Sequence, residues 1–121
     1  MSINKVNLQS KLSTFSEHWS PKIIGELNGQ HVKIAKLQGD FVMHKHDNED
    51  ELFYVIDGTL FIELEDKTIE LNRGEFVVIP RSVPHRPYAP EEVSILLFEP
   101  TSTLNTGNVE NEMTVKQLDR I

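Results

Sequence analysis

The dipeptide Asp57-Gly58 places the tightest constraint on the fold, because it separates two short runs of apolar residues. Asp-Gly is one of the strongest sequence signals for a two-residue turn between antiparallel strands. Such a turn pairs Val55 with Leu60, and paired residues share a face of the sheet. One face of this hairpin then carries a single charged side chain among apolar ones: Glu51, Phe53, Val55, Leu60, Ile62 and Leu64.

The carboxylate of Glu51 needs a partner, because burying an unpaired carboxylate beside an apolar interior is energetically costly. His44 and His46 lie two positions apart in the chain, so an extended strand points both imidazoles to the same side. Residues 47–50, Asp-Asn-Glu-Asp, favour a turn that brings Glu51 back toward these histidines. The pattern predicts a cluster of two histidines and one glutamate at the mouth of an antiparallel sheet.

Further strand-like runs follow one another along the chain, separated by turn signals and without a long helical pattern between them. We expect strands at residues 22–28, 30–37, 52–56, 68–71, 75–79 and 93–98, with turns that include Asn28-Gly29 and residues 89–92. This arrangement is typical of an all-β sandwich or barrel.

Alternation along the strand expected at 30–37 places His31 and Lys33 on the face opposite Val32. His31 is therefore interpreted as a solvent-side histidine, with a place at the rim of the site as the alternative. The second face of the strand at 52–56 is also apolar, which a sheet with one solvated face does not require. Either the N-terminal helix or a second copy of the chain must cover it, and we expect a homodimer.

The two ends of the chain differ from the central part. Helical spacing near the N-terminus predicts an amphipathic helix over residues 8–18, with Trp19 as a packing residue and Pro21 as the stop. Residues 101–121 are polar, and the capping-box spacing of Thr114 and Gln117 favours a short helix there. Within this segment, residues 101–108 either line a site or cross a surface. The expected organisation is a helical arm at 1–20, a β-barrel domain at 21–100 and a C-terminal arm or tail at 101–121.

Composition narrows the classes of protein and of site. A chain of 121 residues fits one domain, and its net charge of −7 without a Lys/Arg cluster argues against nucleic acid as a partner. The chain has no cysteine, so any metal must be held by nitrogen and oxygen ligands, and a reducing cytoplasm is the expected location. No run has the length and apolarity of a membrane span or a signal peptide, so no membrane partner is expected.

Two spaced motifs resemble those of the cupin superfamily of small barrels. The first is formed by Gly39, His44, His46, Glu51 and Gly58, and the second by Gly74, Pro80 and His85. The chain departs from the family pattern by one residue fewer after Gly39, by Ser82 in place of glycine and by Ala89 in place of asparagine. The resemblance implies a double-stranded β-helix, or jelly roll. It also implies that one divalent metal ion is held by four residues in the barrel mouth: His44, His46, Glu51 and His85.

The implied ligand set suits Fe(II), Mn(II), Ni(II), Cu(II) or Zn(II), and the sequence does not choose among them. We expect a metal-dependent protein that acts on a small organic molecule by oxygenase, isomerase or lyase chemistry. The alternative is a non-catalytic module that binds or senses a small ligand or a metal. The sequence identifies no catalytic residue beyond the metal ligands. Phosphosugar isomerisation is disfavoured because no inward-facing Arg or Lys is expected, and Arg86 alternates away from His85.

Overall fold

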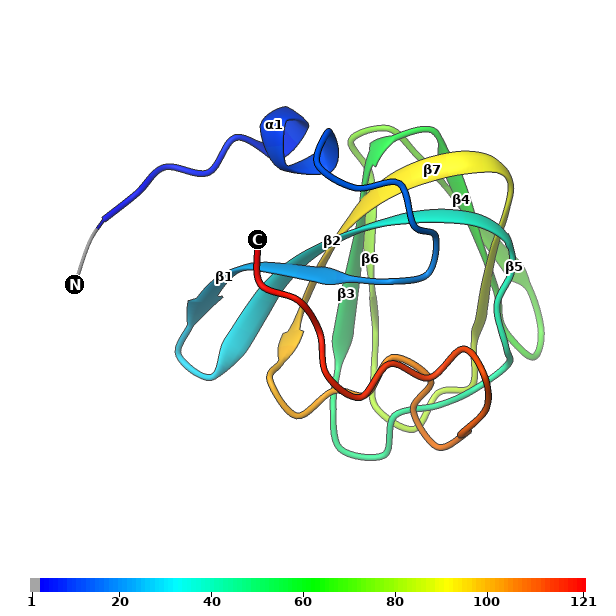
Figure 1. Cartoon of the computed structure of the whole chain (residues 1–121). Helices are drawn as coiled ribbons and strands as arrows, with labels where there is room; N and C mark the ends of the chain where they lie inside the picture. The colour runs from blue at the N-terminus through cyan, green and yellow to red at the C-terminus, as the bar shows by residue number, and fades with distance from the viewer. Residues whose placement is uncertain (1–2) are drawn as a thin grey trace.

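The computed structural model describes residues 3–121, which form one short helix and seven strands (Figure 1). In chain order these are α1 (Leu8–Leu12), β1 (Lys22–Leu27), β2 (Gln30–Asp40), β3 (Glu51–Asp57), β4 (Thr59–Glu63), β5 (Thr68–Asn72), β6 (Phe76–Ile79) and β7 (Arg86–Pro100). Residues 3–121 contain no helix that is long and apolar enough to span a bilayer.

All strand pairs are antiparallel, and β7 organises the sheet. The strand order is β1-β2-β7-β3-β6, while β4 pairs with β5 and with the first residues of β7. The sheet bends through β7, so that side chains from its two parts enclose one core. This core includes Leu60 and Leu71 from one part and Phe53, Val55 and Ile95 from the other. The predicted all-β jelly roll with a short N-terminal helix is confirmed.

The hairpin predicted at Asp57-Gly58 is wrong, although the faces derived from it are right. Strand β3 pairs with β6 and β7, whereas β4 pairs with β5 and β7. The chain instead steps from one part of the sheet to the other at Gly58, which has φ +96° and lies close to the Val93 backbone. The inward positions change from odd in β3 to even in β4 at this corner, just as they would in the hairpin. The inward set is therefore buried as expected: Glu51, Phe53, Val55, Leu60 and Ile62.

The turn at Asn28-Gly29 is confirmed as a two-residue hairpin between β1 and β2, with Leu27 opposite Gln30. Asn28 and Gly29 have φ +47° and +75°, the positive values that a type I′ turn requires at both positions. The solvent-side interpretation of His31 is wrong. His31 and Lys33 are buried, because their face of β2 also carries Ala35 and points into the barrel.

Three further expectations are corrected. Helix α1 ends at Leu12, because the hydroxyls of Ser13 and Thr14 donate to the carbonyls of Ser10 and Lys11 and so compete with helix continuation. Residues 89–92 lie within β7, as an irregularity in its pairing with β2. Residues 101–121, all of which the structure describes, contain no helix.

The C-terminal segment is packed along its length against the barrel (Figure 1). Thr106 is fully buried, and its hydroxyl lies 2.7 Å from that of Thr114. The end of the segment lies beside β1, where the Ile23 amide donates to the Asp119 carbonyl and the Ile121 amide donates to the Ile23 carbonyl. These contacts hold the segment against the barrel.

Candidate metal centre

Main-chain hydrogen bonds bring the two histidine-bearing segments together. The His44 amide donates to the His85 carbonyl at 3.0 Å, and the His85 amide donates to the His44 carbonyl at 2.8 Å. The Ser82 amide donates to the His46 carbonyl at 2.7 Å. Ser82 has φ +70°, which explains why glycine is usual at this position of the motif. The loop before His85 is therefore fixed to the segment that carries the other two histidines.

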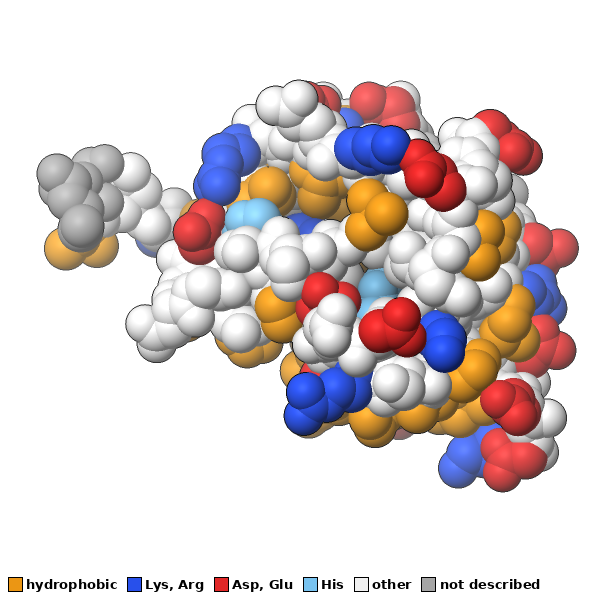
Figure 2. All heavy atoms as spheres, turned by 90° about the horizontal axis from the view of Figure 1, so that it is seen from below, with side chains coloured by type: hydrophobic (Ala, Val, Ile, Leu, Met, Phe, Trp, Pro, Cys, Tyr) orange, Lys and Arg blue, Asp and Glu red, His pale blue; other side chains and the backbone are white. Residues whose placement is uncertain are grey.

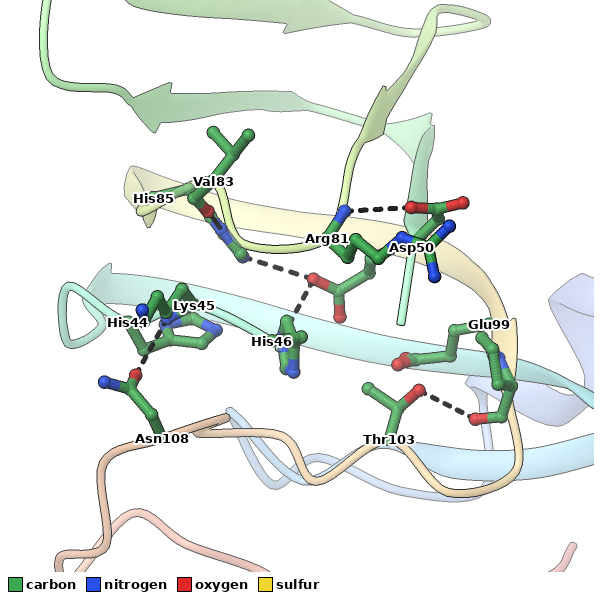
Figure 3. Close-up of polar contacts among 12 residues, drawn as sticks. His44, Lys45, His46, Asp50, Arg81, Val83, His85, Glu99, Thr103 and Asn108 are labelled. Atoms are coloured by element: carbon green, nitrogen blue, oxygen red, sulfur yellow. Dashed lines mark hydrogen bonds and ion pairs between the residues drawn. The ribbon is translucent and has the colours of Figure 1, made fainter. Parts of the chain in front are cut away.

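The structure brings together all four residues that the sequence predicts as ligands. One potential ligand atom from each lies within 4.8 Å of all the others, and all four side chains are buried. Glu51, the first residue of β3, places its Oε1 atom 3.3 Å from His46 Nε2 and 3.2 Å from His85 Nε2 (Figure 3). The cluster lies inside the mouth of the barrel, as expected.

The Nδ1 atoms of two histidines are already engaged. His44 Nδ1 and His85 Nδ1 each lie 2.9 Å from a backbone carbonyl, of Val42 and Val83 respectively. A carbonyl can only accept a hydrogen bond, so each Nδ1 carries the proton. In the neutral rings Nε2 then presents a lone pair toward the centre, which is the tautomer that metal-binding histidines use.

The charge states of these residues leave lone pairs, and no proton, pointing at the centre of the cluster. Burial, helped by the nearby His85, lowers the pKa of His44 to about 4, so this ring is neutral at pH 7. Burial alone would raise the pKa of Glu51, but its interactions with the adjacent His46 and His85 outweigh burial and lower it. His46 Nε2 is buried and has no hydrogen-bond partner in the part of the chain that the structure describes. An ionised carboxylate facing imidazole lone pairs is a donor set that fits a divalent cation.

Residues 102–108 cover this centre from outside the sheet. The Asn108 amide donates to the Lys45 carbonyl, and the Asn108 side chain accepts from the Lys45 amide at 2.9 Å (Figure 3). The Ser102 hydroxyl donates to Glu49. Of the two roles left open by the sequence for this run, the structure shows that it lines the site. Figure 2 looks onto this end, where histidine atoms lie at the bottom of a hollow rimmed by acidic and basic side chains.

A cavity of about 40 Å³ lies inside the barrel and shares Glu51 with the histidine cluster. Its walls are mostly apolar and include Trp19, which stacks on Phe41 with ring centroids 4.7 Å apart. Two charged side chains that the sequence analysis missed, Lys33 and Glu99, also line the cavity. The signal for Lys33 was present in the sequence, because it shares the face of Ala35 in strand β2.

Comparison with known proteins supports this arrangement. The family model Cupin_2, described as a cupin domain, matches residues 30–99. A cupin-2 domain protein from Shewanella frigidimarina is 45% identical, with a TM-score of 0.78 over 78% of this chain and 93% of that chain. Protein NMB1881 from Neisseria meningitidis is 30% identical, with a TM-score of 0.74 over 81% of this chain and all of its own. The chain belongs to the cupin family.

A relative from Bacillus subtilis, the uncharacterized protein YdbB, is 38% identical over 64 residues, which are 52% of this chain and 57% of YdbB. The chain spans about half the length of the curated relatives it matches. Family and geometry together define a small cupin with a three-histidine, one-glutamate cluster that could hold a metal ion.

Proposed function

We propose that His44, His46, Glu51 and His85 bind one divalent transition-metal ion, and that the protein uses this ion to act on a small organic molecule. The observation that carries the proposal is the buried Nε2 atom of His46, which has no hydrogen-bond partner within residues 3–121. A buried polar atom without a partner is costly, and a metal ion bound to its lone pair removes that cost.

The protein residues have distinct tasks in this proposal. The carbonyls of Val42 and Val83 hold the rings of His44 and His85 in the required tautomer. Glu51 supplies the negative charge that favours a cation. When bound, Fe, Mn, Ni, Cu or Zn supplies a Lewis acid with open positions for water, dioxygen or substrate. The metal's identity within this series is not part of the proposal.

The cavity beside Glu51 favours an enzyme over a protein that only stores metal. An apolar cavity with a few polar groups next to a charged cluster is the usual arrangement of a small-molecule site. We propose oxygenase, isomerase or lyase chemistry. Turnover tests this point, because an enzyme consumes dioxygen or converts substrate, whereas a binding module only saturates.

Metal analysis of untagged protein, purified without added metal, tests the proposed centre. We expect close to one equivalent of a single divalent metal in the wild type. In His46→Ala we expect at least a tenfold lower metal affinity, because loss of a residue that only supports a ligand already costs about 10–100-fold. His18→Ala is the matched control, because His18 is partly exposed and pairs with Glu92 away from the cluster. Full metal occupancy in His46→Ala would contradict the assignment of the site.

We also propose that the protein is a homodimer. Leu52 and Tyr54 of β3 lie opposite Val78 and Phe76 of β6, and all four point away from the core. On the other side of β3, the same two residues lie opposite Phe98 and Leu96 of β7. These six residues form what we call the outer apolar face. Phe76 is 61% exposed and Val78 48%, so a second copy of the chain is the proposed cover.

Two earlier expectations stay predictions. The cytoplasmic location rests on the lack of cysteines. The division of the chain into a helical arm, a barrel domain and a C-terminal arm, with boundaries at residues 20 and 100, rests on composition and on the sequence pattern of the strands.

A further inference from the structure

The cavity beside the histidine cluster contains a buried lysine and a buried glutamate. Lys33 and Glu99 are 3% and 2% exposed, on neighbouring strands β2 and β7. Their side chains both line the cavity, whose other polar members are Glu51 and Asn105. Figure 3 shows Glu99 extending from its strand toward the histidine cluster. The pair therefore lines the same cavity as Glu51, one of the proposed metal ligands.

This pair does little for the stability of the fold. Lys33 Nζ and Glu99 Oε1 are 3.6 Å apart, which is longer than a hydrogen bond. Removing two charges from water costs several kcal/mol per ion, and an imperfect pair recovers only part of this cost. Apolar side chains at both positions would suit the surrounding walls better. Stabilisation of the fold therefore does not explain why Lys33 and Glu99 are buried together.

The two groups also leave hydrogen-bonding capacity directed at the cavity. Glu99 Oε2 is buried and has no hydrogen-bond partner among the residues that the structure describes. The ammonium group of Lys33 has three donors, and the Glu99 carboxylate at 3.6 Å is too far away to accept a hydrogen bond from it. A ligand hydroxyl satisfies both, because its oxygen accepts from Lys33 while its hydrogen is donated to Glu99.

We propose that Lys33 and Glu99 select a small hydroxyl-bearing aliphatic ligand, whose hydroxyl binds between them while an oxygen at its other end faces the metal centre. The inference rests on the proposed metal site and names the substrate class for it. The size of the cavity, about 40 Å³, fits a short chain. By the same measure one water molecule needs roughly 10–15 Å³, so the part of the ligand inside the cavity is only a few heavy atoms.

Matched pairs of probes test this selectivity in Zn(II)-loaded protein. 3-Hydroxypropanoate is compared with butanoate, and 4-hydroxybutanoate with pentanoate; each pair differs by a hydroxyl in place of a methyl group. Trp19 is the only tryptophan and lines the cavity, so its fluorescence reports binding, and calorimetry gives an independent Kd. For at least one pair we expect the hydroxylated probe to bind about tenfold tighter or more, the effect of one to two net hydrogen bonds.

The double variant Lys33→Met/Glu99→Leu removes both charges together, which avoids stranding one of them in the core. We expect it to bind Zn(II) like the wild type but to lose the preference for the hydroxylated probe. Any preference that arises from chelation of the metal would survive in this variant. Lys22→Met is the control, because Lys22 is also buried and ion-paired but does not line the cavity.

The outcomes separate this inference from the proposed function. Wild-type protein that binds Zn(II) without preferring a hydroxylated probe overturns the Lys33–Glu99 assignment and leaves the metal site standing. Wild-type protein that binds no metal overturns both. A preference that persists in the double variant also overturns the assignment. The comparison within the wild type needs no variant, so poor folding of a mutant cannot obscure the result.

Discussion

Gly107 lies directly against the main chain of Lys45, the residue between His44 and His46. A Cβ atom at position 107 would overlap the Lys45 carbonyl and lie 3.1 Å from His44 Cδ2. Gly107 also has φ +55°, a backbone conformation that L side chains rarely adopt. The C-terminal segment can therefore cover the histidine cluster only with glycine at this position.

Replacing Gly107 by alanine should displace the segment from the centre. We expect Gly107→Ala to lower the free energy of unfolding by about 2–4 kcal/mol, from backbone strain and overpacking together. Metal affinity should also fall, because the displaced segment no longer packs against the ring of His44. Urea unfolding and metal titration check the two effects. Gly74→Ala is the control, since Gly74 also has a positive φ of +83° but a Cβ atom there would meet no other atom within 4 Å. This variant should be less stable by only about 1 kcal/mol and should keep its metal affinity. Equal effects from the two substitutions would contradict a covering role for Gly107.

The buried His44 should make the metal-free protein less stable in acid. Its pKa is 6.5 when unperturbed and about 4 in the fold, lowered by burial and by His85. Between these values the unfolded chain binds more protons than the folded one, so stability rises with pH across this window and levels off above it. The full difference is about 3 kcal/mol. Glu51 acts in the same direction at lower pH, because its lowered pKa adds stability that is lost as the carboxylate is protonated.

Urea unfolding of metal-free protein between pH 4.5 and pH 7.5 measures this slope. His44→Gln should flatten it, because glutamine does not titrate, whereas His18→Gln should leave it nearly unchanged. A slope that is the same in His44→Gln and the wild type would show that another group is responsible.

Ser82 offers a test of stored backbone strain. Its φ of +70° costs a non-glycine residue about 1–2 kcal/mol, whereas glycine adopts it freely at the cost of a more flexible unfolded chain. We expect Ser82→Gly to raise the free energy of unfolding by about 0.5–1 kcal/mol, net of that flexibility. Ser82→Ala keeps a Cβ atom and should give no gain. If Ser82→Gly were destabilising, the serine side chain would have a role beyond its backbone geometry.

Local patterns predicted the faces of the strands better than their partners. The alternation that buries Phe53 and Leu60 is a property of each strand and survives any pairing. Asp57-Gly58 permits both a hairpin and a corner between two parts of a sheet, because positive φ at Gly58 serves either. The choice depends on β7, which begins at Arg86 and pairs with both β3 and β4.

The site shows the same division between local and long-range information. The spacing of the histidines and Glu51 is encoded within a short stretch, and the distant His85 entered through the family resemblance. Lys33 was placed with His31 on the strand face opposite Val32, and His31 on that face was interpreted as a solvent-side residue. The burial of Lys33 depends on Glu99, which reaches the same face only through the pairing of β2 with β7. The covering role of Gly107 depends on residues 102–108 folding back over the histidine cluster, and no local sequence pattern predicts this contact.

Charges placed on the outer apolar face should separate the proposed dimer. Phe76 and Val78 lie on β6, the last strand in the β1-β2-β7-β3-β6 order, and their side chains are the most exposed of this face. We expect Phe76→Glu/Val78→Lys to shift the protein from dimer to monomer in size-exclusion chromatography with light scattering, with the fold and metal content retained. Met43→Glu is the control, because Met43 is 40% exposed but lies near the histidine cluster, away from this face. A wild type that is monomeric at high micromolar concentration would contradict the proposal, because an apolar face of this kind is then tolerated in water without a partner.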